Sequence, residues 1–170
     1  MEPLSTGTSV PSYQAVLGAL PTKNGTERTS HSLKRNKQVV ERIWADLVNG
    51  GRLESLEELV SNDFYDHAPL PGLPADVGGL RERLRILHRA FPDFHSAITD
   101  LVAENDKIVA FVVSSGTHRE EFAGVPATGR RFAIQEIQIF RIVDGKMVEH
   151  WQVADLFGML VQLGLASSPW

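Results

Sequence analysis

Residues 132–164 read FAIQEIQIFRIVDGKMVEHWQVADLFGMLVQLG, and this stretch decides the fold class. Two segments, 132–143 and 147–154, are rich in β-branched and aromatic side chains, and the Asp144-Gly145 pair between them is a strong hairpin signal. An apolar run at helical spacing then begins at Leu156 and stops at Gly164. We therefore predict an antiparallel hairpin followed by a short helix.

Upstream of this stretch the pattern of apolar residues changes from helical to strand-like. Two more strands are expected at 95–103 and 108–119. Before them, apolar residues at helical spacing predict three helices, at 39–48, 53–60 and 80–91. Helices first and strands afterwards indicate an α+β domain with an antiparallel meander.

Three local features fill the rest of the domain. Phe64–His67 is a short extended candidate, and the three prolines of the following segment, 68–74, predict a surface loop. Four arginines of the third helix could form a phosphate-binding patch, but a solvated helix face is the commoner meaning of this pattern; they are Arg81, Arg83, Arg85 and Arg89.

The first 32 residues differ in composition from the rest. Sixteen of them are Ser, Thr, Gly or Pro and four are charged, so they bury too little apolar surface to order themselves. We predict a flexible N-terminal extension over 1–32, in which 13–20 could form one helical turn, and a single folded domain over 33–170. Without a basic leader or a long apolar run, a cytoplasmic location and no membrane partner are expected.

Composition narrows the classes of function. The 170 residues are 42% hydrophobic and 22% charged, which is typical of a globular domain. A formal charge of −4 argues against nucleic acid as a partner. The chain has no Cys, which excludes disulfides, thiolate metal sites and Cys nucleophiles, and its six His lack the spacing of zinc motifs. We therefore expect no metal, and the absence of nucleotide-binding and serine-hydrolase motifs argues against nucleotide and serine-hydrolase chemistry.

Strand alternation predicts which polar side chains share a face. In 132–143, Glu136 and Gln138 interrupt a row of apolar residues, although the opposite face is mixed too and alternation alone does not say which is inside. In the last strand Trp151 shares a face with Asp155, and His150 lies on the reverse.

Asp155 has two interpretations. A carboxylate beside an indole would have its charged form disfavoured by desolvation, which suits general acid/base work. Its place just before an apolar helical run also predicts a helix N-cap, and the pattern alone favours the cap. Three histidines, His67, His118 and His150, are individually more typical of structural or exposed positions than of catalysis.

Several motifs occur in an order and spacing that resemble a known family. They are Asp63–His67, Ala90–Phe94, Gly116–His118, Phe122–Arg130, Asp144–Trp151, Asp155 and Gln162–Gly164. Over about residues 36–165 the chain resembles the SnoaL-like polyketide cyclase (ester cyclase) family. The resemblance implies the nuclear transport factor 2-like fold, a curved antiparallel sheet wrapped around N-terminal helices to form a cone with a deep pocket.

The resemblance also implies an activity and a set of site residues. Family cyclases use one Asp as acid/base in an intramolecular aldol condensation, without metal or cofactor, and by motif position that residue is Asp155. Gln138, His118 and His67 are then candidate hydrogen-bond donors to substrate carbonyls. The full set expected at the substrate is His67, His118, Gln138, Glu136, Trp151 and His150. A homodimer is expected from the fold resemblance, helped by the apolar last helix.

We therefore expect a cofactor-independent cyclase or isomerase of a hydrophobic carbonyl compound, with Asp155 as acid/base in an apolar pocket. One alternative is a noncatalytic module that binds a hydrophobic ligand or dimerises through its sheet. Another is an epoxide hydrolase-like enzyme, which needs several polar groups around one water, to which Asp66, Asp100 and Arg141 could contribute.

Overall fold

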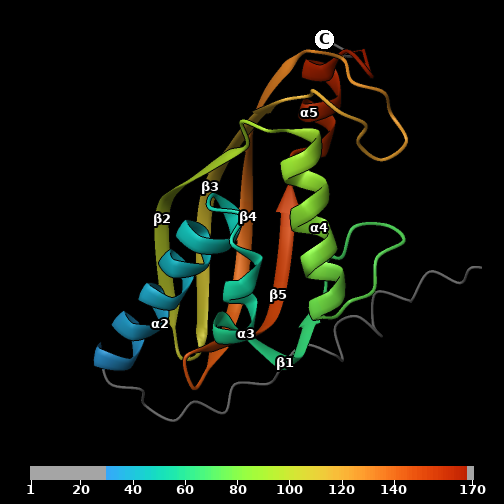
Figure 1. Cartoon of the computed structure of the whole chain (residues 1–170). Coiled ribbons are helices and arrows are strands. Elements are labelled where there is room, and N and C mark those ends of the chain that lie inside the picture. Colours follow the sequence, from blue (N-terminus) through green and yellow to red (C-terminus); the bar gives the residue numbers. More distant parts are fainter. Residues whose placement is uncertain (1–29, 168–170) are drawn as a thin grey trace, which may run out of the picture.

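The computed structural model describes residues 30–167, and all of its helices except the last precede its long strands (Figure 1). The predicted extension, with its helical turn at 13–20, falls almost wholly outside the described residues. In chain order the elements are α2 (Ser30–Ile43), a π-helical turn (Trp44–Val48), a 3-10 turn (Leu53–Ser55), α3 (Leu56–Leu59), β1 (Val60–Asp66), α4 (Val77–Ala90), β2 (His95–Glu104), β3 (Lys107–Thr117), β4 (Arg131–Val143), β5 (Lys146–Ala154) and α5 (Leu156–Leu163).

The five strands form one curved sheet in the order β1-β5-β4-β3-β2. Strands β2 to β5 are an antiparallel meander, which confirms the expected strand arrangement. The β4–β5 turn places both Asp144 and Gly145 at positive φ, 50° and 80°, as the tightest hairpins require. β1 pairs with β5 in parallel, a contact that nothing in the local pattern of residues 60–66 indicates.

The predicted helix at 53–60 is wrong in extent. A 3-10 turn precedes α3, which ends at Leu59, and Val60 already belongs to β1. Val60 is 1% exposed and pairs with Met147 of β5. A buried position in the sheet stabilises a β-branched residue more than one further helical residue would. Strand pairing therefore determines the conformation of Val60, although its spacing from Leu56 is helical.

Helices α2, α3 and α4 cover one face of the sheet (Figure 1). The larger core cluster lies between them and the sheet, and includes Trp44, Leu47 and Phe140. A smaller cluster, which includes Phe91 and Phe132, lies toward α5. Each fully buried side chain of this size contributes about 1.5–3 kcal/mol to folding.

A register shift in the β4–β5 pair decides which residues face the core. Arg141 pairs with Glu149, whereas the next residue, Ile142, pairs with Met147, so Val148 is left over as a bulge. Met147 and His150 therefore both lie on the buried side of β5. On β4, the row that contains Phe132, Glu136 and Phe140 faces inward, which settles the choice that alternation left open.

Candidate active site

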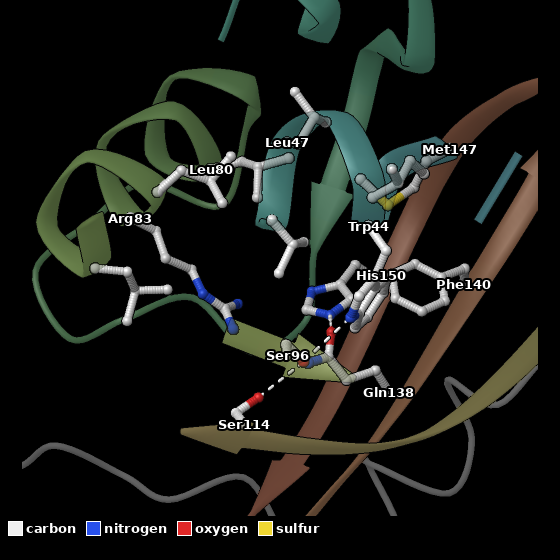
Figure 2. Close-up of a pocket in the computed structure, with 14 residues that line it drawn as sticks. Trp44, Leu47, Leu80, Arg83, Ser96, Ser114, Gln138, Phe140, Met147 and His150 are labelled. Carbon is white, nitrogen blue, oxygen red and sulfur yellow. Dashed lines mark hydrogen bonds between the residues drawn. The ribbon is translucent and has the colours of Figure 1, made fainter. Parts of the chain in front are cut away.

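A cavity opens between the helices and the inner face of the sheet (Figure 2). It holds ≈ 540 Å³ of space between its lining atoms, counting the part open to solvent. Most of the wall is apolar, and the residues that line it are Ile43, Trp44, Leu47, Val48, Leu80, Arg83, Leu84, Leu87, Ser96, Ser114, Gln138, Phe140, Met147 and His150.

His150 is the central polar residue of the cavity. β5 carries it and β1 carries its partner Asp66, whose Oδ1 lies 3.0 Å from His150 Nδ1. The other ring nitrogen, Nε2, lies 3.1 Å from Oε1 of Gln138. The imidazole also stacks on Phe140, with the two ring centroids 5.2 Å apart. The parallel β1–β5 pairing is therefore what brings the carboxylate to the histidine.

Burial has opposite effects on the two partners. It lowers the pKa of His150, and the nearby Arg83 charge acts in the same direction, although the hydrogen bond to Asp66 opposes both. Burial acts to raise the pKa of Asp66, but the hydrogen bond to His150, the Ala68 N–H and the Arg83 charge together hold that pKa below its usual value. His150 is consequently held in its neutral form and Asp66 in its ionised form near pH 7.

Gln138 connects His150 to a second carboxylate. Its Nε2 donates to Oε2 of Glu136 at 3.0 Å, and Gln152 Nε2 donates to the same oxygen. With Gln138 in this orientation its Oε1 faces His150, so Nε2 of His150 must carry a proton. When Nε2 is unprotonated, Gln138 must turn its amide N–H toward that nitrogen. The orientation of this one amide is therefore set by which nitrogens of His150 carry protons.

Arg83 of α4 closes the other side of this network. It is an ion-pair partner of Asp66, with Nη1 3.6 Å from Oδ2, and its Nη2 donates to Gln152 Oε1. Nη1 itself is buried, has no hydrogen-bond partner among residues 30–167, and belongs to a side chain that lines the cavity (Figure 2). The interpretation of the four arginines as a solvated face is wrong for Arg83, whose side chain is 13% exposed. A guanidinium with one free donor is suited to developing negative charge on a substrate oxygen.

A second polar group lies on the β2 and β3 side of the cavity. Ser96 Oγ accepts hydrogen bonds from Trp44 Nε1 at 3.1 Å and from Ser114 Oγ at 2.9 Å. Both serines are almost fully buried, and all three residues line the cavity. The polar lining is thus divided between a charged network on β1, β4, β5 and α4 and a neutral hydroxyl pair on β2 and β3.

Only part of the predicted site comes together in the cavity. Gln138 and His150 line it, and Glu136 adjoins them through its hydrogen bond to Gln138. Asp155 lies outside it: the carboxylate is exposed and its Oδ1 accepts from Gly158 N at 2.8 Å, so Asp155 is the N-cap of α5. That cap is the interpretation that the local sequence pattern favoured.

The remaining predicted residues lie elsewhere. Trp151 and His67 stack on each other at a centroid distance of 4.2 Å, and His67 Nε2 lies 2.8 Å from Glu149 Oε2; neither ring lines the cavity. His118 is buried against Phe91, near the smaller core cluster, and its Nδ1 accepts from Thr128 N. Thr128 fixes the neutral tautomer with its proton on Nε2.

Local sequence patterns missed Arg83, Ser96, Ser114 and Trp44 as site residues, and named Asp66 only for the epoxide alternative. The other two residues named for that alternative, Arg141 and Asp100, do not line the cavity: Arg141 pairs with Glu149, and Asp100 is exposed. One available signal was a polar residue on an otherwise apolar strand face, which describes Ser114 between Val112 and Gly116.

Within residues 30–167 no group of three or more His, Cys, Asp or Glu side chains is arranged to hold a metal ion. In the same residues, no helix combines the length and the apolar character needed to cross a membrane.

Comparison with known proteins places this site in a family. The family model for the SnoaL-like polyketide cyclase matches residues 38–163, which include every residue of the cavity wall. The chain belongs to the SnoaL-like polyketide cyclase family. The nogalonic acid methyl ester cyclase of Streptomyces nogalater is 29% identical over 124 residues, which are 72% of this chain and 90% of that protein.

Solved structures share the fold of this SnoaL-like chain. TsrD from Streptomyces laurentii is 30% identical with a TM-score of 0.68, over 82% of this chain and 100% of that one. IdmH from Streptomyces antibioticus is 34% identical with a TM-score of 0.67, over 76% and 98%. The α+β architecture of the nuclear transport factor 2-like type, with a curved open sheet and N-terminal helices, is confirmed.

Proposed function

We propose that this SnoaL-like protein closes a ring in a polyketide ester by an intramolecular aldol reaction, with His150 as the acid/base. One observation carries the choice of residue: among residues 30–167, His150 and Arg83 are the only titratable side chains that line the cavity. The family and the nogalonic acid methyl ester cyclase relative support the reaction class. The apolar wall formed by Trp44, Phe140 and their neighbours suits an aromatic substrate.

The reaction needs one proton to leave carbon and to reach oxygen. Gln138 gives up its hydrogen bond to His150 Nε2 when the substrate binds, and neutral His150 takes on that nitrogen a proton from the carbon between a ketone and the ester. Asp66 stabilises the imidazolium that results through its hydrogen bond to Nδ1. The enolate carbon then attacks a second carbonyl carbon, forming a C–C bond and an alkoxide, and His150 returns the proton to that oxygen. No atom is gained or lost. The free Nη1 of Arg83 stabilises the negative charge on the enolate oxygen.

Asp155, the acid/base implied by the family resemblance, is the rival candidate, and one assay separates the two. Nogalonic acid methyl ester and aklanonic acid methyl ester, which the names of two relatives specify, serve as test substrates. Chromatography follows their conversion to cyclised isomers of the same mass. We expect His150→Gln to lower kcat/KM at least about 100-fold. Asp155→Asn should stay within about threefold of wild type, because Asn keeps the cap and removes only the charge.

The controls cover the other outcomes. His95→Gln changes an exposed histidine of β2 and should leave kcat/KM unaltered. Full activity in His150→Gln together with inactive Asp155→Asn would assign the chemistry to Asp155. Binding of both esters without conversion by the wild-type chain would favour the noncatalytic ligand-binding alternative.

We also propose that the protein is a homodimer formed through the outer face of the sheet. Phe111 of β3, Ile137 of β4 and Val153 of β5 lie in register across this face and are all exposed, Val153 by 75%. A row of apolar residues on three adjacent strands is typical of an interface. Light scattering after size exclusion should give twice the chain mass for wild type and a single chain mass for Ile137→Asp. A wild-type monomer at high concentration would reject the dimer.

A further inference from the structure

The hydroxyl pair on the β2 and β3 side of the cavity has one hydrogen more than it can use. The group formed by Trp44, Ser96 and Ser114 contains three polar hydrogens: one indole N–H and two O–H. The N–H is used on Ser96 Oγ, and one O–H joins the two serines. The third hydrogen has no acceptor among the described residues, because no other hydrogen bond involves either hydroxyl.

The structure fixes this group firmly in place. Asn49 holds the backbone of Ser96 from both sides: its Nδ2 donates to Ser96 O at 2.9 Å and its Oδ1 accepts from Ser96 N at 2.8 Å. Ser96 and Ser114 pair directly across β2 and β3 and are 1% and 2% exposed. Trp44 packs edge-on against Phe140. A spare donor is therefore held in a fixed position on the β2 and β3 side of the cavity.

From this count we infer that Ser96 and Ser114 form a binding subsite for a ketone or quinone carbonyl oxygen of the ligand. A carbonyl oxygen is an acceptor without a hydrogen of its own, so it satisfies the spare O–H and adds no unpaired donor. The inference rests on the proposed function for the nature of the substrate. It adds to that function by saying how the non-reacting end of the substrate is held.

The position of the subsite sets the size of the ligand. Ser114 pairs with Ile134 of β4, and Gln138 lies four residues further along the same strand. Four strand residues span about 13 Å. A ligand that contacts both the hydroxyl pair and the His150–Gln138 end must therefore be several fused rings long, as an aromatic polyketide is. The two ends orient such a molecule in one direction.

A pair of small probes that differ in one carbonyl tests the subsite. The full ¹⁵N-labelled chain is titrated with 1-indanone and, separately, with indane, and the indole Nε1–H resonance of Trp44, assigned with Trp44→Phe, is followed. We expect 1-indanone to bind about 3- to 10-fold more tightly than indane. It should also move the Trp44 resonance downfield, because a donating Ser96 hydroxyl becomes a stronger acceptor. Indane should produce no such shift.

Two variants complete the test. In Ser96→Ala/Ser114→Ala the preference for the ketone should fall to about one, whereas Ser115→Ala, on the opposite face of β3, should keep it. Equal binding of the two probes by wild type, binding of neither, or an unchanged preference in the double variant would overturn the inference. The wild-type titrations decide it even if the double variant does not fold. Turnover is not measured, so failure of the esters to cyclise would refute the proposed function without affecting this result.

Discussion

Replacing Asp66 with Ala is expected to lower the free energy of unfolding by about 3–5 kcal/mol, the usual cost of removing one partner from a buried ion pair. Three groups point at this carboxylate: Ala68 N at 2.9 Å, His150 Nδ1 at 3.0 Å and Arg83 Nη1 at 3.6 Å. Its side chain is only 3% exposed, so water does not replace it. Asp66→Asn keeps an acceptor for Ala68 and should cost less, about 1–3 kcal/mol.

Urea unfolding at pH 7 measures this decrease in the free energy of unfolding. With an m-value of about 1–3 kcal/mol per molar urea, the midpoint of Asp66→Ala should fall by at least about 1 M. The matched control is Asp100→Ala: within the described part of the chain this exposed carboxylate accepts only from the neighbouring Leu101 N, and the variant should lose no more than about 0.5 kcal/mol of stability. A loss below about 1 kcal/mol for Asp66→Ala, or one equal to the control, would refute the network.

The pH dependence of the free energy of unfolding has a definite sign. The folded-state pKa of Asp66 lies below 3.8, so its stabilisation is fully present above pH 3.8 and is lost as the pH falls through the folded-state value. The difference between wild type and Asp66→Ala should therefore be constant near neutral pH and shrink only in strong acid. A difference that disappears between pH 7 and pH 5 would contradict an ionised Asp66.

Three further results are expected. Because the pKa of His150 is lowered from 6.5, the unfolded chain binds more protons just below pH 6.5, and the stability of wild type should fall with falling pH there; His150→Gln should remove that slope in urea titrations. Asp155→Ala should lower stability in thermal unfolding by about 1 kcal/mol through the lost cap of α5, and Asp155→Asn by only a few tenths. Gly164→Ala should cost about 1 kcal/mol in the same scan, since Gly164 ends α5 at φ 75° and a Cβ there would meet the Arg130 guanidinium; no change would reject that strain.

Much of the fold follows from local sequence. The tight turn at Asp144-Gly145, the meander around it and the end of α5 at Gly164 each depend on conformations that a few adjacent residues prefer. Asp155 as a helix cap follows in the same way. These features could be predicted because their causes lie within a few residues of one another.

The positions of the site residues, in contrast, depend on tertiary contacts. The bulge at Val148 changes which side chains of β5 face the core, and it arises only when β5 pairs with β4. Arg83 looks like one of four equivalent arginines until α4 packs over β1 and buries it beside Asp66. Motif position points to Asp155, which lies outside the cavity, whereas His150 lines it.

The sequence by itself determined the α+β class, the four-stranded meander and the family resemblance, because alternation, turn chemistry and motif order are written along the chain. Only the tertiary structure decided that Asp66 meets His150 and that Ser96 meets Ser114, because these partners are 84 and 18 residues apart. Hydrogen bonds across such separations form only after β1 pairs with β5 and β2 with β3. The local sequence around one residue of such a pair does not predict which distant residue is its partner.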